Sequence, residues 1–202
     1  MASNVITAMK DNAVVHPISV LSLEYRHPIT GNEKFTWRRY FANELGQLSQ
    51  GIRTIKGTNT VFFIPKHKVP FTTKKVTYGK IVRDIKLDKV KTHRTWLTAG
   101  GNLLDYYGVL STSTAIVTTT KLILNIIFFT INDRLLTAEI KHFYFNNHLP
   151  DPEYTKLHIS IITEEIIEAY NFSTIQENND WVYMKICNGM HGLKQSGIIS
   201  NL

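Results

Sequence analysis

A change of hydrophobic period near residue 50 limits the folds open to this chain more than any other feature. Before it, five large apolar residues recur at spacings of three and four, which predicts a helix over residues 35–48 that buries one face. These residues are Trp37, Tyr40, Phe41, Leu45 and Leu48. We expect Thr36 to cap this helix and Gly51 to lie just past its end. After it, the segments 60–64, 76–82 and 92–98 read as short strands, the first stopped by Pro65. Helix followed by strands predicts an α+β fold.

The second half of the chain repeats the mixture of helix and strand. We predict a helix within residues 112–129, and strands at 135–140, 154–159 and 181–186. A short helix over 163–170 has Thr163 as its cap, with Glu164 and Glu165 in the first turn, where the helix dipole favours negative charge. Residues 1–34 show weak periodicity and are expected to be a loosely ordered segment before one domain, 35–202.

The net charge of +7 is unevenly distributed. Residues 51–96 hold twelve Lys or Arg against Asp84 and Asp88, a local charge of +10, whereas 132–202 carry a local charge of −4. Aromatic residues interrupt the basic block, a pattern typical of surfaces that bind phosphate. A solvated basic face without any partner is the alternative interpretation.

Several classes of protein are disfavoured. The single Cys187 excludes an intramolecular disulfide framework and suits a reducing compartment. No secretory signal is visible, and the most apolar run has about half of the roughly 20 residues needed to cross a bilayer. We therefore expect an intracellular protein, cytoplasmic or nuclear, without membrane partners. The eight histidines show no zinc-ligand spacing, and no Gly-x-Ser-x-Gly elbow is present.

Two blocks in the last third of the chain carry a resemblance to a known family. The first is Leu136-Thr-Ala-Glu-Ile-Lys-His-Phe-Tyr-Phe-Asn-Asn147, an apolar segment that reaches a carboxylate and then an aromatic ring five residues on. The second is Gly189-Met-His-Gly-Leu-Lys-Gln-Ser-Gly197, after the strand at 181–186. In this order they resemble the reverse transcriptase of copia-type long-terminal-repeat retrotransposons, an RNA-directed DNA polymerase. Further matches lie at 41–46, 57–68, 76–79 and 97–102.

The resemblance implies the fingers (about 52–111) and the front part of the palm (about 112–202) of a right-hand polymerase, an antiparallel sheet with packed helices. It implies that Glu139 occupies the position of the family's catalytic, metal-binding Asp, for Mg²⁺ or Mn²⁺. Phe143, Tyr144, Gln195 and Arg94 would bind the deoxynucleotide, with Tyr144 as the ring that rejects a ribose and Arg94 on the triphosphate. An RNA or DNA primer–template would contact a set of basic side chains. These are Lys66, Lys68, Lys74, Lys75, Lys80 and Lys91. We expect Glu139, Tyr144 and Gln195 to converge on one hollow beneath a cationic flap.

The chain departs from the family pattern in three places. Glu139 is longer than Asp by one carbon–carbon bond, roughly 1.5 Å. Trp96 stands where relatives usually carry another Arg. The sequence contains no Asp-Asp pair and ends before the Tyr-x-Asp-Asp motif that would complete the metal site. We therefore expect a reverse transcriptase fragment that is inactive alone. The alternatives are a non-catalytic basic nucleic-acid-binding module and a decayed remnant without function.

Overall fold

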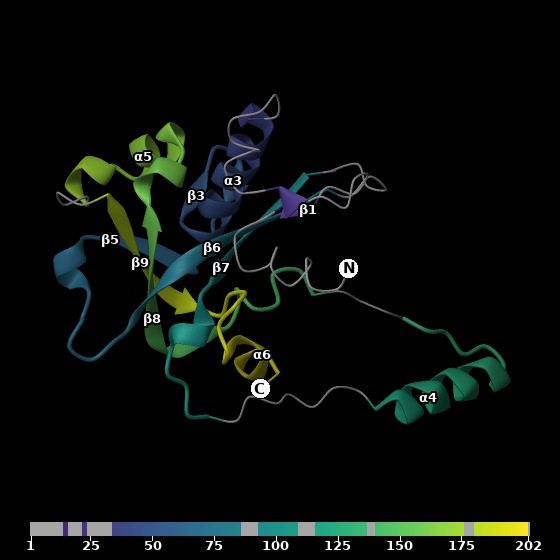
Figure 1. Cartoon of the computed structure of the whole chain (residues 1–202). Helices are drawn as coiled ribbons and strands as arrows, with labels where there is room; N and C mark the ends of the chain where they lie inside the picture. The colour runs from purple at the N-terminus through teal and green to yellow at the C-terminus, as the bar shows by residue number, and fades with distance from the viewer. Residues whose placement is uncertain are drawn as a thin grey trace.

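A five-stranded mixed sheet forms the body of the protein (Figure 1). The computed structural model describes residues 14–15, 22–23, 34–85, 93–108, 116–136, 140–175 and 180–201. The strands lie in the order β5-β9-β8-β6-β7. Their bounds are Val61–Ile64 (β5), Val76–Ile85 (β6), His93–Ala99 (β7), His148–His158 (β8) and Trp181–Asn188 (β9). The expected α+β class is confirmed. Each strand of the sheet overlaps a segment that the sequence predicts to be a strand, although the ends of the two differ.

Strand pairing departs from the expected antiparallel sheet at one position. The pairs β5–β9, β8–β9 and β6–β7 are antiparallel, whereas β6 and β8 run parallel, with Thr77 opposite Thr155. A parallel pair requires a long connection, and here the chain passes through about sixty residues between the two strands. The sheet joins strands from both sides of the boundary expected near residue 111, so this boundary does not separate two sheets in the described part of the chain.

The described part of the chain also contains helices and two small hairpins that lie outside this sheet. The helices are α3 (Lys34–Leu48), α4 (Val117–Phe129), α5 (Glu164–Ala169) and α6 (Ser196–Ile199). Two-stranded ladders join β1 (Val14–Val15) to β2 (Ser22–Leu23) and β3 (Gly51–Ile52) to β4 (Ile55–Lys56). Short 3-10 turns cover Lys66–Lys68, Gly101–Leu103, Ile159–Ile161 and Phe172–Thr174. Figure 1 places α3 and α5 at the same end of the sheet.

The core forms where the apolar face of α3 meets the sheet. Trp37, Phe41, Leu45 and Leu48 are all at most 1% exposed, so four of the five residues of the predicted stripe are buried as expected. The fifth, Tyr40, is half-buried and lines a cavity instead. The strands and α5 contribute the other large side chains of this core. They include Val61, Ile81, Leu97, Leu157, Ile166, Met184 and Ile186. Burial of each such side chain is worth about 1.5–3 kcal/mol, so this one cluster holds the body together.

Two expectations about helix ends are wrong. Helix α3 begins at Lys34, so Thr36 lies within it and does not cap it. Thr163 does precede α5, but its hydroxyl makes no capping bond and is buried without a hydrogen-bond partner. The acidic first turn of α5, with Glu164 and Glu165, is confirmed. Gly51 follows α3 as expected and starts β3 with a φ of 107°, a conformation that glycine adopts without strain.

The strand predicted at 135–140 is absent from its described residues, Leu135, Leu136 and Ile140. A strand is stable only when a neighbour satisfies its backbone groups, and these residues lie at no edge of the sheet. Helix α4 confirms the helix predicted over 112–129 for residues 117–129, and residues 112–115 lie outside the described part of the chain. None of the residues of α4 is buried. Figure 1 shows α4 apart from the sheet. No helix in the described part of the chain is long and apolar enough to span a membrane.

Candidate functional site

Two cavities adjoin each other where α3, β7 and the segment 140–146 meet. The larger one, with a volume of about 1010 Å³, is lined by Lys56, Arg94 and Lys141, and we call it the cationic cavity. The smaller one, of about 310 Å³, is lined mainly by rings and is called the aromatic cavity. Its rings belong to Trp96, His142, Phe143, Tyr144, Phe145 and His191. Both cavities share Glu44, Gln47, Trp96 and His142, so together they form one cleft.

Helix α3 forms one wall because it is amphipathic. Its apolar stripe is buried, and a second stripe at positions 40, 43, 44 and 47 faces the cleft with polar groups. Strand β7 forms the opposite wall at the edge of the sheet. Alternation along β7 buries Thr95, Leu97 and Ala99 and leaves Arg94 and Trp96 half-buried at the cleft.

Hydrogen bonds from asparagine side chains hold the third wall, the turn at 140–146. The Asn147 amide donates to the Phe143 carbonyl at 2.7 Å, and the Asn188 amide donates to the Phe145 carbonyl at 2.8 Å. Gln47 Nε2 lies 3.3 Å from Nδ1 of His142, which connects this turn to α3. His142 itself has a φ of 59°. The turn therefore holds its shape without belonging to a regular helix or strand.

The His191 ring packs edge to face against two rings of the aromatic cavity, whereas His142 stacks on Phe145. His191 lies with its ring centroid 5.4 Å from Tyr144 and 5.6 Å from Phe145. Burial lowers the pKa of His191, and burial together with the Lys141 charge lowers the pKa of His142. Both imidazoles are therefore neutral at physiological pH. The positive charge of the cleft comes from Lys56, Arg94 and Lys141.

Glu44 is the one carboxylate among the residues that line the two cavities. Its Oε1 accepts a hydrogen bond from the Leu97 N–H at 3.3 Å. Burial raises the pKa of Glu44 to about 7, although the Leu97 bond opposes the shift. A strongly shifted acid in a cleft is a feature of functional sites. Sequence reasoning missed Glu44, Lys56 and Lys141. The polar stripe of α3, opposite the apolar one, was the available signal for Glu44.

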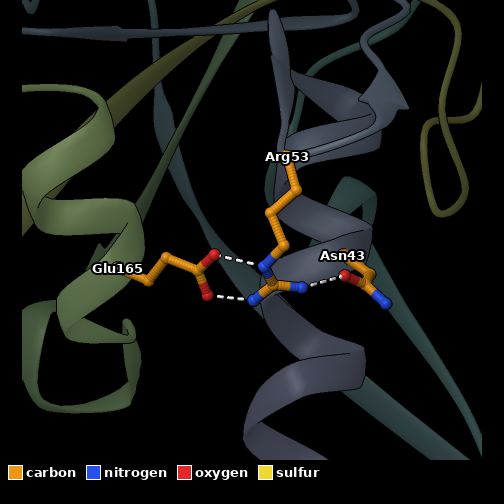
Figure 2. Close-up of polar contacts among 3 residues, drawn as sticks. All are labelled: Asn43, Arg53 and Glu165. Atoms are coloured by element: carbon orange, nitrogen blue, oxygen red, sulfur yellow. Dashed lines mark hydrogen bonds and ion pairs between the residues drawn. The ribbon is translucent and has the colours of Figure 1, made fainter.

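An arginine bridge connects α5 to Asn43 of α3 (Figure 2). Arg53 binds the Glu165 carboxylate of α5 through two nitrogens, and its third nitrogen donates to Asn43 Oδ1 at 2.7 Å. Asn43 lines the cationic cavity. The bridge therefore fixes α3 relative to α5 through a residue that lines this cavity.

Three of the predicted nucleotide-binding residues come together in this cleft: Arg94 in the cationic cavity, and Phe143 and Tyr144 in the aromatic one. Gln195 lines neither cavity. Its side chain is buried, and its amide donates to Glu153 Oε1 of β8 at 3.2 Å. Glu139 lies outside the described residues, as does Lys91. Ile140, the residue after Glu139, lines the aromatic cavity.

The predicted template-binding lysines differ in their surroundings. Lys66 and Lys68 are exposed on their 3-10 turn. Lys74 pairs with Asp151 at 2.5 Å and with Glu153 at 3.8 Å, and Lys75 pairs with Asp105 at 2.6 Å. Lys80 is half-buried on β6, opposite Thr98 of β7. Among the described members of this set, Lys66 and Lys68 are thus exposed without an ion pair to a described acid.

The metal expected at Glu139 cannot be placed, because that residue lies outside the described ranges. Within those ranges, no group of three or more His, Cys, Asp or Glu side chains is placed to hold a metal. A scan against protein-family models, a search of curated proteins and a search of solved structures each found no match to this chain.

Proposed function

We propose that this chain is the nucleotide-binding portion of a reverse transcriptase, and that it does not extend a primer by itself. The observation that carries the proposal is the joining of a cationic and an aromatic cavity in one cleft. Polyphosphate needs fixed cations and a base needs an apolar or aromatic wall, and this cleft offers them side by side. The ordered sequence blocks that resemble copia-type reverse transcriptases support the same conclusion.

The chemistry of the walls suggests how the ligand lies. Arg94 can bind two phosphate oxygens with its guanidinium fork, while Lys56 and Lys141 act as single charges in the same cavity. The base and sugar then lie against Trp96 and Tyr144, which line the aromatic cavity. Ligand pockets commonly have volumes of about 300–1,000 Å³, so the cleft has room for one nucleoside triphosphate.

Calorimetric titration with dATP tests nucleotide binding. Arg94→Ala removes a charge-assisted phosphate contact worth about 1.5–3 kcal/mol, so we expect binding to weaken by roughly ten- to hundredfold. Arg39→Ala is the matched control, because Arg39 is exposed on α3 and lines neither cavity. Equal affinities for wild type and Arg94→Ala would reject the assignment of the cleft.

Primer extension tests the claim of inactivity. Purified protein is given primed template, deoxynucleotides and Mg²⁺, with Glu139→Ala as the control. We expect no product above that control, because the chain supplies Glu139 and no Asp-Asp pair. Extension by wild type alone would show that the chain carries a working metal site.

The outer face of the sheet favours a second candidate function, a non-catalytic nucleic-acid-binding module. Across the strands, Phe62 and Tyr154 both lie opposite Lys185, and Tyr78 and Tyr183 both lie opposite Lys156. Phe62 and Tyr78 remain 36% and 41% exposed and can take a stacked base, whereas Tyr183 is only 7% exposed. Aromatic rings beside lysines are what single-stranded nucleic acids stack on.

Fluorescence anisotropy with a labelled primer–template tests the module. We expect binding that weakens with salt and is abolished by reversing the charges of Lys66 and Lys68. Reversal of Lys74 and Lys75 is a poorer probe, because it would leave Asp151 and Asp105 facing new acids. The double variant Lys34→Glu/Arg39→Glu, at exposed positions of α3, matches the change of charge. Unchanged affinity in the Lys66/Lys68 variant would exclude the module.

A further inference from the structure

The Glu44 carboxyl group lies at the junction of the two cavities, since it lines both of them. One oxygen accepts the Leu97 N–H. Among the described residues no Lys or Arg forms an ion pair with Glu44. A ligand that reaches from the cationic to the aromatic cavity must therefore pass a carboxyl group that no cation has neutralised.

Every neighbouring element places at least one titratable or charged group in the lining of the same cleft. These groups are Tyr40 of α3, Lys56 of β4, His93 and Arg94 of β7, Lys141, His142 and Tyr144 of the turn, and His191 after β9. The cations attract phosphate at every pH of interest. The two histidines with lowered pKa, His142 and His191, are neutral above pH 7. Glu44, whose pKa burial raises to about 7, changes charge near neutrality.

We propose that the cleft binds its nucleotide only with Glu44 protonated, so that binding to the protein with ionised Glu44 takes up one proton at this carboxyl group. The inference rests on the proposed nucleotide-binding function. Ionised Glu44 repels a polyphosphate that lies in the cationic cavity, and it does so in a partly desolvated site where charges are poorly screened. Protonated Glu44 removes the repulsion and offers an O–H donor to the ligand at the junction.

The proton comes from solvent, and no bond in the ligand is made or broken. The coupling makes affinity depend on pH. Above the pKa of Glu44 in the free protein, the dissociation constant rises tenfold for each pH unit. Titration of the terminal phosphate of the nucleotide affects wild type and Glu44→Gln alike, so the difference between the two proteins isolates the contribution of Glu44.

Calorimetric titration with dATP, without metal, at pH 7.5 and 8.5 measures this slope. We expect about a tenfold weaker affinity at the higher pH. Repeating the titration at pH 8.5 in two buffers with different protonation enthalpies counts the protons, and we expect about one taken up per dATP. Glu44→Gln keeps the shape of the side chain and an oxygen for the Leu97 N–H. It should bind with no proton uptake and at least tenfold more tightly than wild type at pH 8.5.

Glu168→Gln is the matched control, because Glu168 is an exposed acid on α5 and lines neither cavity. It should retain the proton uptake of wild type. Affinity of wild type that does not change with pH, or proton uptake that persists in Glu44→Gln, overturns the inference but leaves nucleotide binding intact. Absence of dATP binding at every pH rejects the proposed function itself. The proton count on wild type needs no variant, so the inference remains testable if Glu44→Gln fails to fold.

Discussion

The backbone N–H of Leu97 on β7 donates a hydrogen bond across 3.3 Å to the Glu44 carboxylate on α3. The bond connects helix and sheet at the edge of the cleft, and it satisfies a backbone group of an edge strand. Its acceptor is an acid whose pKa burial raises from 4.5 to about 7. The stability of the whole protein should therefore depend on pH in part through Glu44, with or without a ligand.

The contribution of Glu44 to the free energy of unfolding should become less favourable as pH rises from about 4.5 to 7. In that window the unfolded chain ionises Glu44 while the folded protein keeps it protonated, so the free energy of unfolding falls, by roughly 3 kcal/mol in all. Above pH 7 this contribution is constant. We expect Glu44→Gln to be more stable than wild type by up to that amount at pH 8 and equal to it near pH 4.5. Urea unfolding at the two pH values measures the difference, and a variant less stable than wild type at pH 8 would contradict the burial of this acid.

Gly192 should tolerate no side chain. Its φ is 91°, and a Cβ there would lie 2.1 Å from the carbonyl oxygen of Ala99. The same backbone carries the bond from the Ala99 N–H to the His191 carbonyl, at 2.8 Å. We expect Gly192→Ala to cost about 3 kcal/mol or more, because backbone must move and the conformation is strained. Gly108→Ala is the control in thermal unfolding, since its Cβ would meet only the movable end of the Tyr106 side chain. Equal melting temperatures would show that the turn is not packed as described.

The sequence predicted those elements whose signal is local. The apolar stripe of α3 and the alternation in β6 and β7 appear within single segments, and all three elements formed. The parallel pairing of β6 with β8 could not be predicted in this way, because it depends on contacts between residues far apart in the sequence. The strand expected at 135–140 looked equally good in composition. Its described residues form none, because extended backbone needs a partner.

The candidate site was predictable to a similar extent. Arg94, Phe143 and Tyr144 were chosen by the resemblance, and they do line one cleft. Lys56 could not be distinguished from other lysines, because only the fold directs it into a cavity. The shift of Glu44 also depends on burial that no local pattern reveals. Gln195 shows a different limit of the resemblance. The motif identified this residue, but it did not predict that the side chain turns toward Glu153 and lines neither cavity.

Replacing Gln195 should distinguish a structural role from nucleotide binding. The amide of Gln195 donates to the Glu153 carboxylate, and burial raises the pKa of that acid despite the nearby Lys74 charge. Gln195→Ala leaves the carboxylate short of a donor, so we expect a loss of about 1–3 kcal/mol in the free energy of unfolding. We expect dATP affinity to change less than twofold. A large loss of affinity with unchanged stability would instead place Gln195 at the nucleotide, as the resemblance implies.

Polar substitutions on α4 should improve solution behaviour without destabilising the body of the protein. The helix is apolar on most sides, yet none of its residues is buried, and Phe128 and Phe129 are more than 80% exposed. Apolar surface of this kind promotes association between molecules. We expect the triple variant Leu122→Lys/Ile126→Lys/Phe129→Lys to reduce light scattering at high concentration and to leave the urea midpoint nearly unchanged. Leu45→Ala, in the core, should by contrast cost about 2–5 kcal/mol. If the α4 variant lost as much stability as Leu45→Ala, the helix would be packed in solution. A broad, non-cooperative transition in the wild type would favour the decayed remnant over the nucleic-acid-binding module, because a well-packed single domain of this size usually unfolds in one cooperative step.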